Sequence, residues 1–242
     1  MARKQNNYGN DSLSALKGAE RVRRRPAVIF GSDGIEGCEH SIFEILSNSI
    51  DEAREGFGDT ITVTRYADGS VEVEDHGRGC PVDYNQREGR YNWELVYCEM
   101  YAGGKYNNDT DENYEYSLGL NGLGLCATQY ASEYMDVEIR RDGFQYNLHF
   151  EHGENIGGLQ KKPYAKKDTG TRTRWKPDIE VFTDINVPAE YYLETLKRQA
   201  IVNDRVTFIF RNETENGFET TQFCYQNGIL DYAREIAGED AL

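Results

Sequence analysis

The clearest amphipathic pattern in the chain lies at residues 38–56, CEHSIFEILSNSIDEAREG. At 100° per residue its apolar positions fall on one side, and they are Ile42, Phe43, Leu46, Ile50 and Ala53. A polar stripe recurs every four residues on the other side, formed by His40, Glu44, Asn48 and Glu52, with Asp51 beside it. The pattern therefore predicts a helix with one buried face and one polar face.

The composition of this stripe is unusual for a solvated helix face. Such faces normally mix Lys and Arg with acids and gain ion pairs between residues four apart. Here the first cation is Arg54. Two interpretations stay open at this point, an acidic face that only contacts water, or a site that shares a bound cation or a proton in transit.

Shorter patterns predict the remaining elements. Alternation predicts a hairpin of Thr60–Tyr66 and Ser70–Asp75, joined by Ala67-Asp68-Gly69. Further strands are predicted at 134–140, 144–151, 171–176, 206–211 and 220–226. Further helices are predicted from near Ser12 to just before Pro26, around 93–100, at 123–131 and 188–203, and from Ile229 to the end. We find no repeat or linker in the sequence.

Together these elements predict one α/β domain, an α+β two-layer sandwich. Its mixed, mostly antiparallel sheet is expected to be covered by helices on one face. Residues 1–14 are polar and lack periodicity, so we expect an N-terminal arm followed by a domain at 15–242.

Asp75 is a candidate ligand-binding residue because of its position in the predicted hairpin. It shares its parity with Val71 and Val73, so the pleat directs it to the same face as two valines. A buried carboxylate is costly unless something pairs with it. It either serves the turn that follows, or accepts a hydrogen bond from a ligand at the floor of a pocket.

Two glycine-rich segments follow. Gly77 and Gly79 end the hairpin, where they allow backbone to approach a ligand closely. The second segment, 119–124 (GLNGLG), precedes an apolar helix and offers N–H groups to an anion. Residues 105–116 before it are polar and patternless, as expected for a mobile lid.

The overall composition narrows the class of protein. With 38% hydrophobic and 29% charged residues, and no apolar run near the ~20 residues that a membrane span needs, we expect no membrane association. The five scattered cysteines and the absence of a visible signal peptide predict reduced thiols, no structural zinc and a cytoplasmic location. A net charge of −15 disfavours tight binding of nucleic acid by this chain alone. We interpret two basic islands, Arg21–Arg25 and the loop containing Lys161, Lys162, Lys166 and Lys167, as solvated clusters.

Four signals in this order resemble the GHKL ATPase superfamily, which has the Bergerat ATP-binding fold. They are Glu44-x3-Asn48-x3-Glu52, Asp75-x-Gly77-x-Gly79, the Gly119–Gly124 segment, and Thr169-Gly170-Thr171. Within this superfamily the chain is most similar to the ATPase domains of bacterial type IIA topoisomerase B subunits, those of DNA gyrase or topoisomerase IV. The phrases Leu16-Lys17-Gly18, Val22-Arg23-x2-Arg25-Pro26, Asp51-Glu52-Ala53 and Ala102-Gly103-Gly104-Lys105 add to this resemblance, which extends from about Tyr8 to Tyr232.

The resemblance implies a role for each matched residue. Glu44 corresponds to the general base that activates water, His40 to the residue that orients it, and Asn48 to the Mg²⁺ ligand. Asp75 corresponds to the acceptor for the adenine amine, supported by Thr171, while Glu52 pairs with Arg78 beside the purine. Ile45, Val73, Pro81 and Thr173 would line the base pocket near Gly79. The implied phosphate, lid and arm contacts are Lys105, Tyr114, Gly119, Leu120, Asn121, Gly122, Leu123, Gly124 and Tyr8.

The resemblance also implies the biology. ATP would clamp two B subunits together, and the A subunit and DNA would bind through domains outside this chain, which we expect to be a fragment without the transducer domain and its γ-phosphate lysine. Aminocoumarin-type inhibitors are plausible ligands of the ATP site. His76, Ser47, Leu118, Asn121 and Leu123 depart from the usual family residues, and the lid departures affect expected phosphate affinity. The alternatives are an ATP-gated dimerisation module without efficient hydrolysis, and a histidine kinase or MutL-type ATPase.

Overall fold

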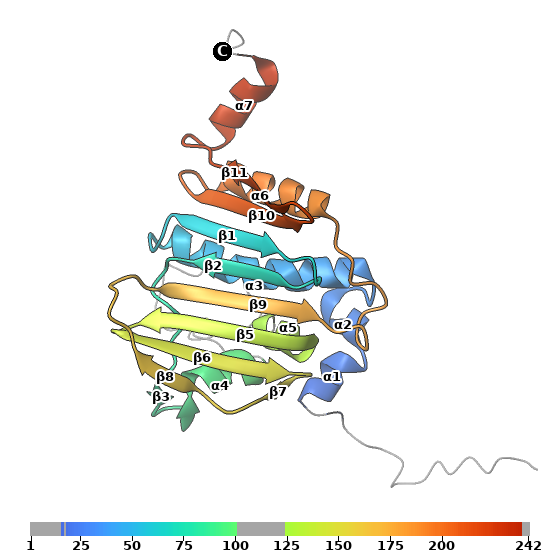
Figure 1. The fold of residues 1–242 in the computed structure, drawn as a ribbon, viewed down its shortest axis with the longest axis vertical. Coiled ribbons are helices and arrows are strands. Elements are labelled where there is room, and N and C mark those ends of the chain that lie inside the picture. The colour runs from blue at the N-terminus through green and yellow to red at the C-terminus, as the bar shows by residue number, and fades with distance from the viewer. Residues whose placement is uncertain (1–15, 17, 101–123, 239–242) are drawn as a thin grey trace, which may run out of the picture.

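A nine-stranded mixed sheet forms the centre of the protein in the computed structural model, which describes residues 16, 18–100 and 124–238. The strand order is β11-β10-β1-β2-β9-β5-β6-β7, and β8 pairs with β6 (Figure 1). Only the β1–β10 pairing is parallel among the pairings of this sheet. The strands are β1 (Thr60–Arg65), β2 (Val71–Asp75), β5 (Ser132–Arg141), β6 (Phe144–Glu151), β7 (Glu154–Asn155), β8 (Gln160–Pro163), β9 (Gly170–Pro177), β10 (Thr207–Thr214) and β11 (Gly217–Phe223). The predicted mixed, mostly antiparallel sheet is confirmed.

Helices cover one face of this sheet, as predicted (Figure 1). They are α1 (Ala19–Arg23), α2 (Pro26–Phe30), α3 (Ile35–Arg54), α4 (Asn92–Cys98), α5 (Gly124–Tyr130) and α6 (Ala189–Val202), whereas α7 (Ile229–Ala237) has no buried residue and projects beyond the β11 edge of the sheet (Figure 1). Helix α3 packs on β1, β2 and β9, and α6 packs on β10 and β11. No helix in the described part of the chain is long and apolar enough to cross a membrane.

Helix α3 forms because its apolar residues recur on one side over 20 residues, about 30 Å of helix at 1.5 Å per residue. Ile42, Leu46 and Ile50 are at most 3% exposed, whereas Phe43 and Ala53 are only partly buried. Asn48 and Glu52, on the polar stripe, remain exposed or half-buried. The helix thus holds a line of polar groups in fixed spacing at the surface of the helical layer.

The region around Pro26 differs from the prediction of a single helix from Ser12. Ser12 lies outside the described residues, and within them the first helix is only α1, which ends before Pro26 as expected. Pro26 then begins α2, because proline at the first helical position has a suitable φ and needs no N–H partner. Gly31, with φ 78°, ends α2 in the left-handed region.

Several short strands were missed by the sequence patterns. β3 (Tyr84–Asn85) and β4 (Arg90–Tyr91) form a separate two-stranded sheet, and β7 and β8 extend the main sheet. The prediction of a loop at residues 161–167 is therefore wrong for Lys161 and Lys162, which lie in β8. Two-residue strands are too short for alternation to be visible, and β8 is exposed at all four positions.

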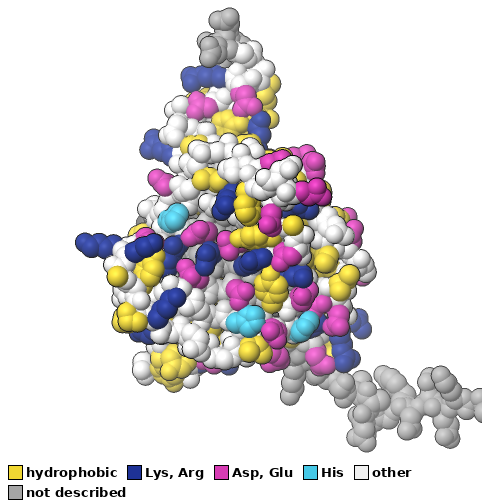
Figure 2. Space-filling model, viewed as in Figure 1, with side chains coloured by type: hydrophobic (Ala, Val, Ile, Leu, Met, Phe, Trp, Pro, Cys, Tyr) yellow, Lys and Arg dark blue, Asp and Glu magenta, His cyan; other side chains and the backbone are white. Residues whose placement is uncertain are grey.

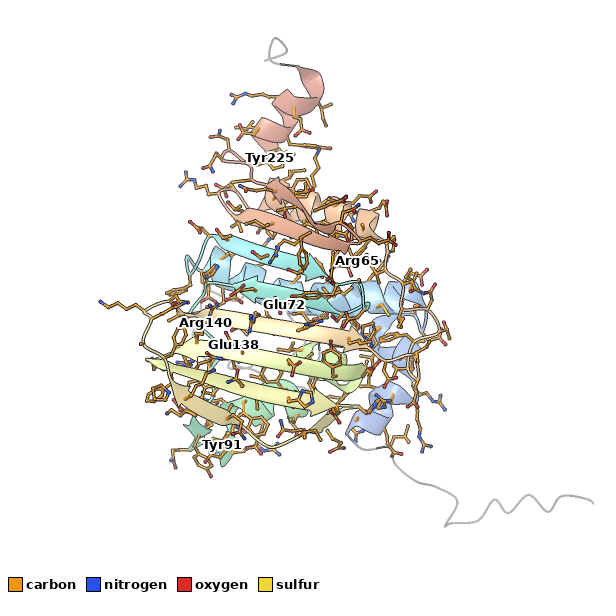
Figure 3. All side chains as sticks on the ribbon, viewed as in Figure 1. Arg65, Glu72, Tyr91, Glu138, Arg140 and Tyr225 are labelled. Carbon is orange, nitrogen blue, oxygen red and sulfur yellow. The ribbon has the colours of Figure 1, made fainter. Side chains whose placement is uncertain are left out.

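The second face of the sheet carries charged side chains instead of helices. Figure 2 shows acidic and basic groups intermixed over this face, and Figure 3 shows Glu72, Glu138 and Arg140 on it. Arg140 bonds Glu74 at 2.8 Å, and Arg172 bonds Glu138 at 2.9 Å. The charged side chains at these outward-facing positions pair with one another. The opposite, apolar side of the strands packs against the helices and forms the core.

Candidate functional site

The polar stripe of α3 contains a direct histidine–carboxylate pair. Nε2 of His40 lies 3.0 Å from Oε1 of Glu44, one helical turn away. The hydrogen bond to Glu44 raises the pKa of His40 above its usual value, although partial burial acts in the opposite direction. The pair therefore holds the Glu44 carboxylate in one orientation, as expected for a base with an orienting histidine.

Glu44 also lies against the start of α5. A Cβ atom placed on Gly124 would overlap the Glu44 carboxylate, so a larger residue at this position would displace that side chain. Glu44 is thus enclosed by His40 on its own helix and by the backbone of α5. This contact brings Gly124, the last residue of the predicted glycine-rich segment, to the polar stripe.

Asn48 offers an amide oxygen on the same stripe. Its Nδ2 donates to the backbone oxygen of Glu44 at 2.7 Å, which fixes the orientation of the side chain. Within the described ranges we find no hydrogen bond to its Oδ1. An exposed amide oxygen of this kind fits one coordination position of Mg²⁺, which usually keeps waters and phosphate oxygens as its other ligands.

The predicted burial of Asp75 is confirmed, since the residue is 6% exposed. Its Oδ1 accepts hydrogen bonds from the backbone N–H groups of Gly77 at 2.9 Å and Thr171 at 3.1 Å. Its Oδ2 accepts one from Oγ of Ser49 at 2.9 Å. Burial raises the pKa of Asp75, and these three hydrogen bonds counteract part of that rise. The hydrogen bond from Gly77 fulfils the turn role that the sequence analysis left open for Asp75. The bonds from Thr171 and Ser49 come from distant parts of the chain and are not explained by the turn.

Ser49 is the residue of this site that sequence reasoning missed. It is 4% exposed and lies on the buried side of α3, facing β2. A hydroxyl among apolar positions of a helix is the signal that could have identified it, because a buried polar group requires a partner.

The predicted pair of Glu52 and Arg78 forms. Nε and Nη2 of Arg78 lie 3.0 and 2.7 Å from the two Glu52 oxygens, and the Arg78 backbone N–H also donates to Glu52. Glu55 adds a third acidic contact, and the guanidinium lies 4.0 Å from the centre of the Phe57 ring. Burial would raise the pKa of Glu52, but its bonds with Arg78 lower it overall. Arg78 is therefore held rigidly at the edge of the site, with Phe57 against the guanidinium.

The segment Thr169-Gly170-Thr171, at the start of β9, forms hydrogen bonds with the segment that follows Asp75. Oγ1 of Thr169 donates to the Gly77 carbonyl oxygen at 2.6 Å, and Oγ1 of Thr171 accepts from the Cys80 N–H at 3.1 Å. Val73 and Thr173, both predicted to line a base pocket, are buried partners across β2 and β9, and Ile45 is buried as well. Pro81 is exposed, just beyond Gly79 and Cys80.

Gly170 allows the start of β9 to approach the backbone of Asp75 closely, and its replacement tests this role. Its φ is 144°, and a Cβ atom there would overlap the Asp75 carbonyl oxygen. We expect Gly170→Ala to lower the free energy of unfolding by about 3 kcal/mol or more, measured by urea denaturation. Gly143→Ala is the control, because Gly143 also has positive φ (76°) but open space around it, so only about 1 kcal/mol should be lost. Equal losses in both variants would contradict a steric role.

Several predicted site residues lie outside the described residues: Tyr8, Lys105, Tyr114, Gly119, Leu120, Asn121, Gly122 and Leu123. Among the described ones, two groups are assembled. His40, Glu44, Asn48 and Gly124 form the first, and Asp75, Thr171, Glu52 and Arg78 form the second, while Gly79 lies against Ile139, Arg140 and Arg141 of β5. Both groups lie along α3, which supplies His40, Glu44 and Asn48 to the first and Glu52 to the second.

The sequence matches, over residues 35–180, the family described as histidine kinase-, DNA gyrase B-, and HSP90-like ATPase. It is 36% identical over 236 residues to the DNA gyrase B subunit of Thermotoga maritima, covering 97% of this chain and 36% of that protein. It is 36% identical over 229 residues to the DNA topoisomerase 4 B subunit of Salmonella typhimurium, covering 94% of this chain and 35% of that protein. The chain thus spans about a third of the length of these curated relatives.

Two solved structures share the fold. The 43K ATPase domain of Thermus thermophilus gyrase B, solved with an aminocoumarin, has a TM-score of 0.77 at 31% identity and covers 92% of this chain and 56% of that one. The topoisomerase IV ATP-binding domain of Francisella tularensis, solved with a small-molecule inhibitor, has a TM-score of 0.75 at 30% identity. This second alignment covers 92% of this chain and 58% of the other.

Proposed function

Because this chain belongs to the family of histidine kinase-, DNA gyrase B- and HSP90-like ATPases, the GHKL family, we propose that it binds ATP and catalyses its hydrolysis. The observation that carries this proposal is the arrangement along α3. The His40–Glu44 pair lies on the same helix that, further on, contacts the buried Asp75 through Ser49. A general base on α3 and a buried acceptor in β2, held in contact with the same helix by Ser49, suit a nucleotide, which has its nucleobase at one end and its reacting phosphate at the other.

The proposal extends to the ATPase domain of a type IIA topoisomerase B subunit. Its support is homology to the B subunits of gyrase and topoisomerase IV over nearly the whole chain. In this role ATP binding would clamp two B subunits together, and hydrolysis would release them, timing DNA strand passage performed with an A subunit. Because the chain spans about a third of those relatives, strand passage and the contacts with DNA and the A subunit belong to the proposal for the whole protein.

Nucleotide binding would begin at the Asp75 end of the site. The exocyclic amine of adenine donates to Asp75, whose Oδ1 is already occupied by two backbone N–H groups. Arg78, held by Glu52 and Phe57, would lie flat along the purine. A guanine would present a carbonyl oxygen where adenine has its amine, so the carboxylate would repel it. Aminocoumarins would compete for the same acceptor, in line with the ligand of the Thermus thermophilus structure.

Hydrolysis would take place at the His40–Glu44 end. Glu44 accepts the proton of the attacking water, and His40 holds the carboxylate in position through the 3.0 Å hydrogen bond. Asn48 would supply a protein ligand to Mg²⁺, which when bound neutralises charge on the phosphates. Gly124, the last residue of the glycine-rich segment, lies beside Glu44, which supports a phosphate-binding role for this segment next to the base.

We expect residues 1–242 alone to bind ATP as a monomer and to hydrolyse it slowly. Each copy carries a net charge of −15, and the resulting repulsion opposes pairing at moderate salt. Calorimetry with ATP and GTP, light scattering with a non-hydrolysable analogue, and a phosphate-release assay test the proposal together. Absence of ATP binding would refute the proposed function, and a stable dimer with rapid turnover would refute the expected monomer.

A further inference from the structure

The hydrogen bonding of Asp75 leaves a single acceptor position. A carboxylate has two oxygens with about four lone-pair directions in all. Oδ1 receives the two backbone N–H groups of Gly77 and Thr171, so both of its directions are used. Within the described part of the chain, Oδ2 receives only the Ser49 hydroxyl, so one of its directions has no described donor. The position of the Ser49 hydroxyl therefore determines which of the two Oδ2 lone-pair directions remains open.

Ser49 uses its hydroxyl differently from the other buried serines of α3. A serine inside a helix commonly donates to a backbone oxygen one turn earlier. Ser41 does so with Gly37 at 2.9 Å, and Ser47 donates to the Glu44 oxygen at 3.0 Å. Ser49 instead donates across to β2, to a residue 26 positions later in the chain. A short, 4% exposed side chain on a long helix is a donor with almost no freedom to move.

We propose that Ser49 is a positioning residue of the nucleotide site, whose hydroxyl holds the Asp75 carboxylate turned so that one Oδ2 lone pair faces the adenine amine. This inference rests on the proposed ATP-binding function and adds a specific residue to it. Ser49 acts through Asp75 and makes no contact with the nucleotide itself.

The surroundings of Asp75 make the Ser49 donor important. Glu52, on α3, disfavours the ionised form of Asp75, as does burial. The other titratable neighbours are the Cys80 thiol, whose pKa burial raises to about 12, and the Tyr97 hydroxyl on α4, whose pKa is raised by burial, so both are neutral at pH 7. The three hydrogen-bond donors favour the ionised form of Asp75, and so act against burial and Glu52. Loss of one of them should shift Asp75 towards its protonated form, which cannot accept the amine in the same way.

The test is ATP affinity as a function of pH in Ser49→Ala, measured by calorimetry from pH 5 to 8 on the full-length protein. We expect about tenfold weaker binding at pH 7, and we expect the pH at which affinity falls to move upward by about one unit. Ser41→Ala is the matched control, since it removes the same atom from a fully buried serine of the same helix. It should leave both the affinity and the pH profile unchanged.

A double variant separates a positioning role from a purely structural one. If Ser49 acts through the carboxylate, Ser49→Ala should have little further effect in the Asp75→Asn background. Unchanged affinity and pH profile in Ser49→Ala, or full additivity with Asp75→Asn, would overturn the inference while wild-type ATP binding still supported the proposed function. A wild-type protein that fails to bind ATP would overturn both.

Discussion

Glu44→Gln should reduce the rate of ATP hydrolysis by about 10²-fold or more while ATP affinity changes by less than about threefold. The amide keeps the shape of the carboxylate, so it still fits between His40 and Gly124, but it cannot take a proton from water. Turnover is measured as phosphate release by the full-length protein, and affinity by calorimetry. A general base contributes to the transition state rather than to binding of the substrate, which is why the two quantities should separate.

Two further variants show whether the loss of turnover is specific to Glu44. Glu39→Gln changes a partly buried carboxylate on the same helix outside the proposed site, and it should leave turnover unchanged. His40→Ala should cost less than Glu44→Gln, because His40 orients the base and does not take the proton itself. Parallel loss of binding and turnover in Glu44→Gln would show that Glu44 is structural. Binding with unaltered turnover would favour a different base.

Asp75→Asn should weaken ATP binding by about 1–3 kcal/mol, roughly five- to 150-fold, measured by calorimetric titration. The asparagine oxygen can still accept from Gly77 and Thr171, which places the amide nitrogen on the side of Ser49. The Ser49 hydroxyl can rotate to accept from that nitrogen. The ligand amine would then meet a donor in place of an acceptor, and this mismatch is the cause of the lost affinity.

The same substitution should not destabilise the ligand-free protein. Burial raises the pKa of Asp75 above its usual value, so the folded state binds this proton more tightly than the unfolded state does. The ionised group therefore detracts from stability as pH rises above its usual pKa towards the raised folded-state pKa, and the asparagine variant should gain relative to wild type over that rise. Thermal unfolding across this range measures the difference.

Asp178→Asn provides the contrasting control. Its side chain is also buried, but it pairs with Arg23 at 2.7 Å and with His152 at 2.7 Å. Although burial acts against it, these bonds and that of the Glu180 N–H lower the pKa of Asp178, so its ionised form stabilises the fold. The variant should lose stability at neutral pH and keep its ATP affinity. Unchanged ATP affinity in Asp75→Asn would contradict the assignment of Asp75 as the adenine acceptor.

Local periodicity explains why much of the fold could be predicted. A spacing of four residues identified α3 and its polar stripe, and alternation identified the β1–β2 hairpin and the inward parity of Asp75. These features depend on side chains that are close in sequence, so the backbone geometry of one element determines them. Short elements without such a repeat, including β7 and the helix that begins at Pro26, were not predicted for the same reason.

The sequence by itself therefore determined which residue types lie on each face of α3 and β2, and the order of the motifs that mark the family. The resemblance implied that Glu52 meets Arg78 and that Thr171 supports Asp75, but the tertiary structure alone decided the direct contacts that these groups make. Ser49 reaches Asp75 across 26 residues, and the Thr171 N–H reaches the same carboxylate across 96. Arg78 stacks on Phe57, and the parallel pairing of β1 with β10 joins segments of the chain about 147 residues apart. Contacts of this kind depend on how the helices pack on the sheet, and that packing is set by the shape of the whole core rather than by any local repeat.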